Sequence, residues 1–375
     1  MRKKSLLLIG VLAGLTLLLI VKQTGGPAAP PQLSLPEDPA YGARANVQKE
    51  RGELETFVQT RLAGEHGVYT NYLDTDQSRE LATGHEVLSE SASLRMRISV
   101  LAKDKPSFDN EWALAKRTFD LQKGFSYRYS PKQQKSYPMN AAVDDLRMIR
   151  ALYEAGQAFG DGSYTKEANR YGERFYQYNV KDGRLYDFYD EKYNTTNSFV
   201  TLCYADLRTL QLLPAPSKAR QTLLSNMQTI VQDGYLGDEF PFYETRYHYD
   251  RSAYSSGNIN TVESLLTILH LAEVKEAKPA SIRYLKEHVK AGTLFGQYTR
   301  AGEPANSIRS TAIYALTAMI GSETGDYPLY LDSIGRMNAF QVKQQDSPLY
   351  GGFGDVHTNQ AYSFDNLMAL LAYSY

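Results

Sequence analysis

The 375-residue sequence predicts an all-α fold, an (α/α)6 barrel of about twelve helices with short aromatic hairpins or loops at one mouth. Apolar residues recur at three- and four-residue spacing in twelve segments, the period of helices with one buried face. Aromatic, turn-rich stretches separate every second helix from the next, and the whole unit repeats about every fifty residues. Closing such repeats into a ring leaves no terminal repeat exposed.

The N-terminal segment predicts membrane targeting. Residues 1–4 are basic after the initial methionine, and residues 5–21 follow without a charge, which is typical of an export signal or membrane anchor. Seventeen residues lie near the lower limit for crossing a bilayer. Positive charge before the segment favours export of the rest of the chain. We expect residues 1–22 to form an uncleaved anchor, with a cleaved signal peptide as the alternative.

The remaining chain divides into a tether and one long domain. Residues 23–50 are rich in Gly, Pro and Ala and predict a flexible tether, and no second break of this kind follows in residues 51–375. The net charge of −1 favours neither nucleic acid nor anionic lipid. Cys203 is the only cysteine, so no disulfide can form within the chain. The 29 tyrosines suit a polysaccharide groove, because a tyrosine offers an apolar ring face and a polar tip.

The helical periods lie in pairs along the domain. They cover residues 51–64, 86–103, 107–123, 140–159, 165–178, 196–213, 217–232, 259–277, 279–294, 306–321, 327–342 and 362–375. The aromatic stretches lie at 125–129, 185–189, 240–243, 294–298 and 349–353. Each of these stretches precedes an inner helix, so we expect all of them at the same mouth of the barrel.

Acidic residues lie at or near the starts of three helical segments, at Glu90, at Asp144 and Asp145, and at Asp250. In a barrel of this kind they would converge at one mouth. Converging carboxyl groups are what glycoside hydrolysis needs, because one protonates the leaving oxygen and another activates water.

These segments resemble those of the family 8 glycoside hydrolases over about residues 80–375. Ser89-Glu90-Ser91 occupies the place of the family's general acid, and Tyr249-Asp250-Arg251 that of its general base. Val143-Asp144-Asp145-Leu146 matches the segment that holds the sugar at the cleavage subsite. Ser91 replaces a Gly of the family pattern and Val143 replaces an Asp, so the resemblance leaves the substrate open. It implies an inverting hydrolase with Glu90 as acid and Asp250 as base.

Several site assignments have rivals. Asp145 shares a helix face with Met148, Ile149 and Leu152, so we expect Asp145 to face the barrel interior and Asp144 to pair with Arg147. Glu86 competes with Glu90 for the role of the acid. The residues that compete with Asp250 for the role of the base are Asp238, Glu239 and Glu244. The aromatic residues expected to bind substrate are Tyr249, Tyr243 and Tyr189.

The function expected from this pattern is extracytoplasmic, endo-acting hydrolysis of a bacterial exopolysaccharide, accessory to its synthesis or secretion. The partners would be the polysaccharide, a synthase or secretion complex, and the membrane through residues 5–21. None of the six histidines shows metal-ligand spacing in the sequence, so we expect no metal or cofactor. The main alternative is a catalytically inactive polysaccharide-binding accessory protein on the same barrel, and a polysaccharide lyase is a third possibility.

Overall fold

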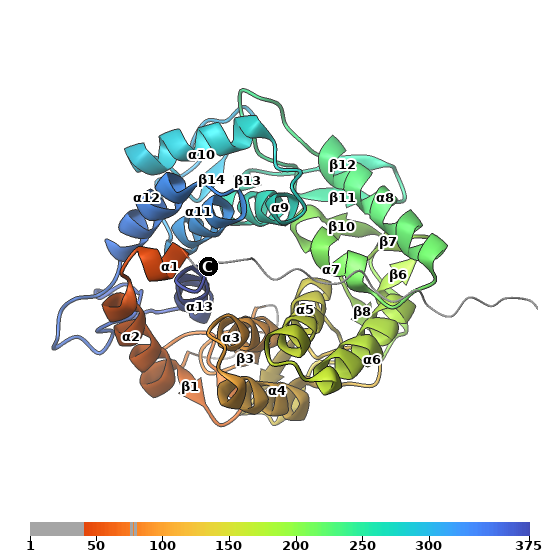
Figure 1. Ribbon diagram of the computed structural model, residues 1–375, viewed down its shortest axis with the longest axis horizontal. Helices are drawn as coiled ribbons and strands as arrows, with labels where there is room; N and C mark the ends of the chain where they lie inside the picture. Colours follow the sequence, from red (N-terminus) through yellow and green to blue (C-terminus); the bar gives the residue numbers. More distant parts are fainter. Residues whose placement is uncertain (1–40, 76–77, 79–80) are drawn as a thin grey trace, which may run out of the picture.

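Two concentric rings of helices make up the barrel (Figure 1). The computed structural model describes residues 41–75, 78 and 81–375. The inner ring consists of α3 (Ser89–Leu101), α5 (Ala142–Ala158), α7 (Leu207–Leu212), α9 (Thr261–Glu273), α11 (Thr311–Glu323) and α13 (Ser363–Ala372). The outer ring consists of α2 (Gln48–Phe57), α4 (Lys105–Phe119), α6 (Gly162–Asn179), α8 (Ser217–Asp233), α10 (Pro279–Ala291) and α12 (Tyr327–Asn338). The predicted all-α barrel is confirmed, and the one-turn helix α1 (Tyr41–Arg44) precedes the twelve barrel helices.

The distribution of apolar residues decides which ring a helix joins. Inner helices are buried on all sides, as in α11, where every residue from Thr311 to Gly321 is buried. Outer helices bury one stripe, as in α6, where Tyr164, Ala168, Tyr171 and Phe175 face inward at helical spacing.

Outer helices also begin with recognisable start signals. The carboxylates of Asp104, Asp161 and Asp326 accept hydrogen bonds from backbone amides at the starts of α4, α6 and α12. A proline stands in the first turn of α4, α10 and α12, where its missing amide costs the helix nothing.

Short antiparallel strands form small sheets between the helices. The three-stranded sheets are β3 (Val87–Leu88), β4 (Arg128–Ser130) and β5 (Lys135–Ser136), and β10 (Phe199–Thr201), β11 (Arg246–His248) and β12 (Ala253–Ser255). The two-stranded sheets pair β1 (Ala63–Gly64) with β2 (Gly67–Val68), β6 (Val180–Lys181) with β7 (Arg184–Leu185), β8 (Tyr189–Asp190) with β9 (Thr195–Thr196), and β13 (Ile259–Asn260) with β14 (Gln297–Tyr298). Since β3 and β13 run directly into α3 and α9, this side of the barrel is where the inner helices begin, and we call it the mouth.

The helix expected over residues 196–213 is wrong in its first half. This segment holds the last residue of β9, all of β10 and the 3-10 helix η2 (Leu202–Tyr204), and α7 begins only at Leu207. The β-branched and aromatic residues of β10 pair with β11, in the register Phe199 to His248. Asp206 then caps α7 through the Thr209 amide, so the inner helix is shorter than its apolar run. At the start of the domain, α2 continues into a π-helical turn, η1 (Val58–Leu62).

The packed domain begins earlier than the sequence indicates. Gly42 N donates to the carbonyl oxygen of Tyr375 at 3.1 Å, and the ring of Tyr41 lies 5.0 Å from that of Tyr327. The last ten residues of the expected tether therefore belong to the barrel. The expected anchor in residues 1–22 lies outside the described residues, and among the described ones no helix has the length and apolar character to cross a membrane.

Close helix packing makes Gly321 of α11 a sensitive position. A Cβ atom there would lie 2.7 Å from Tyr330 N and 3.1 Å from Asp326 O, so the backbone of α12 would have to move. We expect Gly321→Ala to lower the free energy of unfolding by about 1–3 kcal/mol, measured by urea denaturation.

Gly335 of α12 is the matched control, because a Cβ placed there has no atom within 4 Å apart from the adjacent residues and the backbone of its own helix. Gly335→Ala should be neutral or raise stability by up to about 1 kcal/mol. Equal effects of the two substitutions would contradict the packing argument.

Candidate active site

First-turn carboxylates are concentrated on the inner ring. They occur in four of the six inner helices, as Glu90 in α3, Asp144 and Asp145 in α5, Glu263 in α9 and Asp365 in α13. Among the outer helices only α2 has one, Glu50, and the first turns of α4, α6, α8, α10 and α12 hold none. The helix dipole favours an acidic first turn in any helix, so the difference between the rings indicates a function at the mouth.

Glu90 and Asp144 form the centre of this group. Asp144 is held on both sides, since Ser89 Oγ donates to its Oδ2 at 2.8 Å and Arg147 Nη1 donates to its Oδ1 at 3.2 Å. Ser89 and Glu90 are neighbours in the first turn of α3, so the hydrogen bond from Ser89 to Asp144 joins the start of α3 to the start of α5. The expected pairing of Asp144 with Arg147 is confirmed.

Burial and neighbouring charges raise the pKa of Glu90 to about 7. Burial contributes most, Asp144 and Asp365 add to the rise through repulsion, and Arg147 opposes it. Burial also raises the pKa of Asp144, against the effects of Arg147 and Ser89. A carboxyl group in this environment can carry a proton near neutral pH and release it to a reacting atom.

Asp145 occupies a different environment, and the expectation that it faces the barrel interior is wrong. Its Oδ2 accepts from Asn140 Nδ2 at 2.9 Å, and Arg174 of the outer helix α6 acts on its charge. The side of α5 that lines the barrel interior instead carries Val143, Arg147 and Arg150. The apolar residues that suggested the opposite orientation pack elsewhere in the core.

Three further carboxylates near the mouth were missed by the sequence analysis. Burial raises the pKa of Asp187 to about 6, and its carboxylate accepts from Thr201 N and Thr201 Oγ1. Burial also raises the pKa of Glu263 and of Asp365. The signal that could have found the last two is their place in the first turn of an inner helix.

The structure does not bring Asp250 into the group around Glu90. Asp250 is exposed in the turn between β11 and β12, and the charges that act on Glu90 are those of Asp144, Arg147 and Asp365. The neighbouring Tyr249 hydroxyl donates to the carbonyl oxygen of Leu185, which fixes the hairpin against β7.

The tyrosines expected at the substrate differ in exposure. Tyr243 is buried, with 1% of its surface exposed, and packs against Tyr235, so it offers a substrate little surface in this structure. Tyr249 uses its hydroxyl within the protein, as described above. Tyr189 is half-buried beside Tyr178 and bonds weakly to Asn194, so its ring remains accessible from the mouth loops.

Two residues that compete with Glu90 and Asp250 for their roles, Glu86 and Glu244, form ion pairs within the protein. Glu86 is fully buried and binds Arg128 through two bonds of 2.9 and 2.6 Å. Glu244 is buried and pairs with Arg300. The geometry therefore supports Glu90 over Glu86 as the acid.

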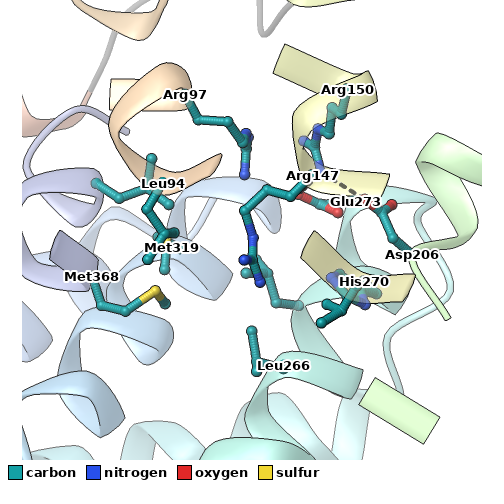
Figure 2. Close-up of a pocket in the computed structure, with 13 residues that line it drawn as sticks. Leu94, Arg97, Arg147, Arg150, Asp206, Leu266, His270, Glu273, Met319 and Met368 are labelled. Atoms are coloured by element: carbon teal, nitrogen blue, oxygen red, sulfur yellow. Dashed lines mark hydrogen bonds and ion pairs between the residues drawn. The ribbon is translucent and has the colours of Figure 1, made fainter. Parts of the chain in front are cut away.

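A second charged cluster lies beneath the mouth, around a cavity of about 20 Å³ lined by the inner helices (Figure 2). Ligand atoms of Asp206, His270 and Glu273 lie within 4.8 Å of one another, a spacing that a metal ion could bridge. Arg150 already supplies a cation there, with Nη1 2.6 Å from Glu273 and 3.8 Å from Asp206. Arg150, Asp206 and Glu273 thus form an ion-pair network with His270 beside it, and no local sequence pattern indicates it because Asp206 precedes α7 whereas Glu273 ends α9.

Asp145 offers a test of this electrostatic description. Burial raises its pKa to about 7, and its Oδ1 has no hydrogen-bond partner. Its contribution to stability is therefore complete below its unfolded pKa of about 3.9 and is lost as the pH rises to about 7. Asp145→Asn should gain stability relative to the parent between pH 4 and pH 8, by on the order of 1–4 kcal/mol, measured by urea denaturation.

Asp332, exposed on α12, is the control for this substitution. Asp332→Asn removes an exposed carboxylate and should not reproduce the gain in stability of Asp145→Asn. A constant difference between Asp145→Asn and the parent at all pH values would contradict the account.

Comparison with known proteins places this geometry in a family. No family model matches the sequence. A structure described as a novel alpha-amylase from Clostridium perfringens is 32% identical, with a TM-score of 0.80, over 87% of this chain and 97% of that one. The endoglucanase Cel10 of Klebsiella pneumoniae, a family 8 glycosyl hydrolase, has a TM-score of 0.58 at 15% identity, over 85% of this chain and 97% of that one.

A relative known from sequence covers a similar span. YdaJ of Bacillus subtilis (strain 168), which is named as a lipoprotein, is 27% identical over 326 residues, or 85% of each chain. Given its identity to the Clostridium perfringens protein over nearly all of that structure, the chain belongs to the six-hairpin barrel glycoside hydrolases, with the fold of family 8.

Proposed function

We propose that this protein is an extracytoplasmic glycoside hydrolase that cleaves a bacterial exopolysaccharide internally, with inversion at the anomeric carbon. Glu90 is the general acid and Asp250 the general base. The proposal is carried by the environment of Glu90, where burial and the neighbouring Asp144 raise the pKa of a mouth carboxyl to about 7.

The base must act from the opposite side of the mouth. Around the inner ring, α9 lies three helices from α3 in either direction, so the connection that leads into α9 faces the start of α3. Asp250 belongs to this connection and is exposed to water, the nucleophile that a base activates. An inverting enzyme leaves roughly 6.5–9.5 Å between the two carboxyl groups to admit that water.

Asp144 is the residue that we propose holds the sugar at the cleavage subsite, in place of the expected Asp145. It lies beside Glu90 and its orientation is fixed by Ser89 and Arg147. A fixed carboxylate can bind a ring hydroxyl without first losing its own freedom of movement.

Exposed apolar side chains at the rim of the mouth support the proposal of an extended carbohydrate substrate. Four exposed large apolar side chains lie in connections that lead into inner helices, namely Leu81, Tyr193, Ile308 and Tyr362. They lie on different sides of the ring, so one polymer could contact several of them. Sugar rings present C–H faces that pack on such side chains while their hydroxyls stay in water.

The proposal that the protein acts outside the cytoplasm rests on its N-terminal sequence and on one related protein. The basic and apolar pattern of residues 1–21 is that of an exported or anchored protein, and YdaJ is named as a lipoprotein. A hydrolase tethered at the cell surface would meet a polymer as a synthase or secretion complex releases it. The alpha-amylase and endoglucanase names of similar structures make α- and β-glucans necessary members of any substrate panel.

The second candidate function is a polysaccharide-binding accessory protein that has lost catalysis. This candidate is favoured because Asp250 is not among the charges that act on Glu90. The two candidates differ in one property, because an accessory protein would bind polymer without releasing any reducing ends.

Residues 41–375 should release reducing ends from at least one polymer of a panel of soluble starch, carboxymethylcellulose, xylan and bacterial exopolysaccharides. Glu90→Gln removes the proton donor and Asp250→Asn removes the base, so each should lower turnover by about 100-fold or more. Polymer binding, followed by affinity electrophoresis, should survive in both.

The matched pair Asp144→Asn and Asp145→Asn separates the two neighbours. Only Asp144→Asn should impair cleavage strongly, because Asp145 faces the outer ring. If folded Glu90→Gln keeps the turnover of the parent, the assignment of Glu90 as the general acid is wrong. If the parent binds polymer without cleaving it, the protein is an accessory protein.

The pH profile of cleavage gives an independent check on Glu90. The acid works in its protonated form, so kcat/KM should decline as the pH rises through about 7, the pKa of Glu90. Asp144→Asn removes a negative neighbour, so its residual activity should decline at a lower pH. If kcat/KM declines at the same pH in both proteins, a group other than Glu90 controls the loss of activity at high pH.

A further inference from the structure

One charged side chain, that of Arg147, connects Glu90 with Asp144. Arg147 lies one turn after Asp144 in α5, and its guanidinium extends into the centre of the inner ring (Figure 2). Only 9% of the residue is exposed. The cavity that it borders (Figure 2) is lined by apolar residues of four other inner helices, Leu94, Leu266, Met319 and Met368, and by the charged or titratable residues Arg97, Arg150, Asp206, His270 and Glu273.

The Nη1 atom of Arg147 makes two contacts at once. It donates to Asp144 Oδ1 at 3.2 Å and to Ser93 Oγ at 3.0 Å. The Ser93 hydroxyl in turn donates to the backbone carbonyl oxygen of Glu90 at 2.7 Å. Arg147 is therefore connected to the carboxylate of Asp144 and, through one hydroxyl, to the backbone of the acid.

We propose that Arg147 is a positioning residue of this hydrolase, which fixes Asp144 and the first turn of α3 relative to each other and balances the negative charge of the mouth. The proposal rests on the proposed function of Glu90. A cation that is largely removed from water acts strongly on nearby charges, because little water is present to screen it. Salt in solution would weaken this effect less than that of a surface arginine.

The charged and titratable groups that face Glu90 come from three elements. Asp144 and Arg147 come from α5, Asp365 from α13 and Tyr204 from η2. Asp144 and Asp365 raise the pKa of Glu90, and Arg147 is the positive charge that lowers it. Without Arg147 the acid would hold its proton to higher pH.

A purely structural arginine would behave differently, and Arg95 of α3 provides the comparison. Arg95 is 8% exposed and pairs with Glu55 at 2.6 Å and Glu111 at 3.0 Å. It faces the outer helices α2 and α4, away from the mouth. Arg95→Met removes a buried charge from the same barrel without touching the Glu90 cluster.

The test titrates Glu90 without substrate. Infrared difference spectra of residues 41–375 would follow the carbonyl stretch of the protonated carboxyl that Glu90→Gln lacks. In Arg147→Met the titration midpoint should move up by about one pH unit or more. In Arg147→Lys, which keeps the charge, and in Arg95→Met it should stay within a few tenths of a unit. No shift in folded Arg147→Met, or an equal shift in Arg95→Met, would overturn the proposal.

The geometric part is tested on the polymer that the parent cleaves. A lysine cannot reproduce the guanidinium geometry at Asp144 and Ser93, so Arg147→Lys should lower kcat roughly tenfold or more, with KM nearly unchanged. Parental kcat in Arg147→Lys would overturn the positioning role, even if Arg147→Met fails to fold. If Glu90→Gln cleaves normally, the proposed function fails, whereas the titration still decides whether Arg147 acts on Glu90.

Discussion

The site depends on the contact between Asp144 and Arg147 at the centre of the inner ring. Two hydrogen bonds, from Ser89 to Asp144 and from Arg147 to Ser93, hold the starts of α3 and α5 together, and a third, from Arg147 to Asp144, fixes both side chains within α5. Because Asp144 is fixed and negative, it also raises the pKa of Glu90. The same contact thus supplies both the geometry and the proton affinity that an acid catalyst needs.

The inner ring is unusual because it buries charged side chains. Its axis is lined by charged side chains that continue below Arg147 through Arg97, Arg150, Glu154 and Glu273. Networks of this kind give little net stability, since the cost of removing charges from water offsets their attraction. They do specify one arrangement of the helices, because any shift leaves a buried charge without a partner. In this barrel, the arrangement so specified is the one that sets the positions of Glu90 and Asp144.

The sequence predicts the barrel well because its signals are local and repeated. Helical periods, the aromatic connections and the acidic first turn of α3 can each be recognised within one segment. The error at Asp145 has a physical origin in the inner helix, which is buried on all sides. Apolar periodicity cannot tell the axis from the outer ring there, and the side of α5 that lines the axis carries Arg147 and Arg150 rather than the apolar residues. The cluster of Asp206 and Glu273, and the approach of Arg174 to Asp145, join residues distant in sequence, so no local pattern encodes them.

The most direct measurement is a crystal structure of Glu90→Gln with an oligosaccharide of the cleaved polymer bound across the mouth. We expect the amide introduced by this substitution to lie within hydrogen-bond distance of the scissile glycosidic oxygen, and Asp144 to bind a hydroxyl of the adjacent sugar. A carboxylate on the opposite face, that of Asp250, should lie roughly 6.5–9.5 Å from the introduced amide with a water between them. A sugar chain bound away from position 90 and Asp144, or an opposite face without any carboxylate, would contradict the account.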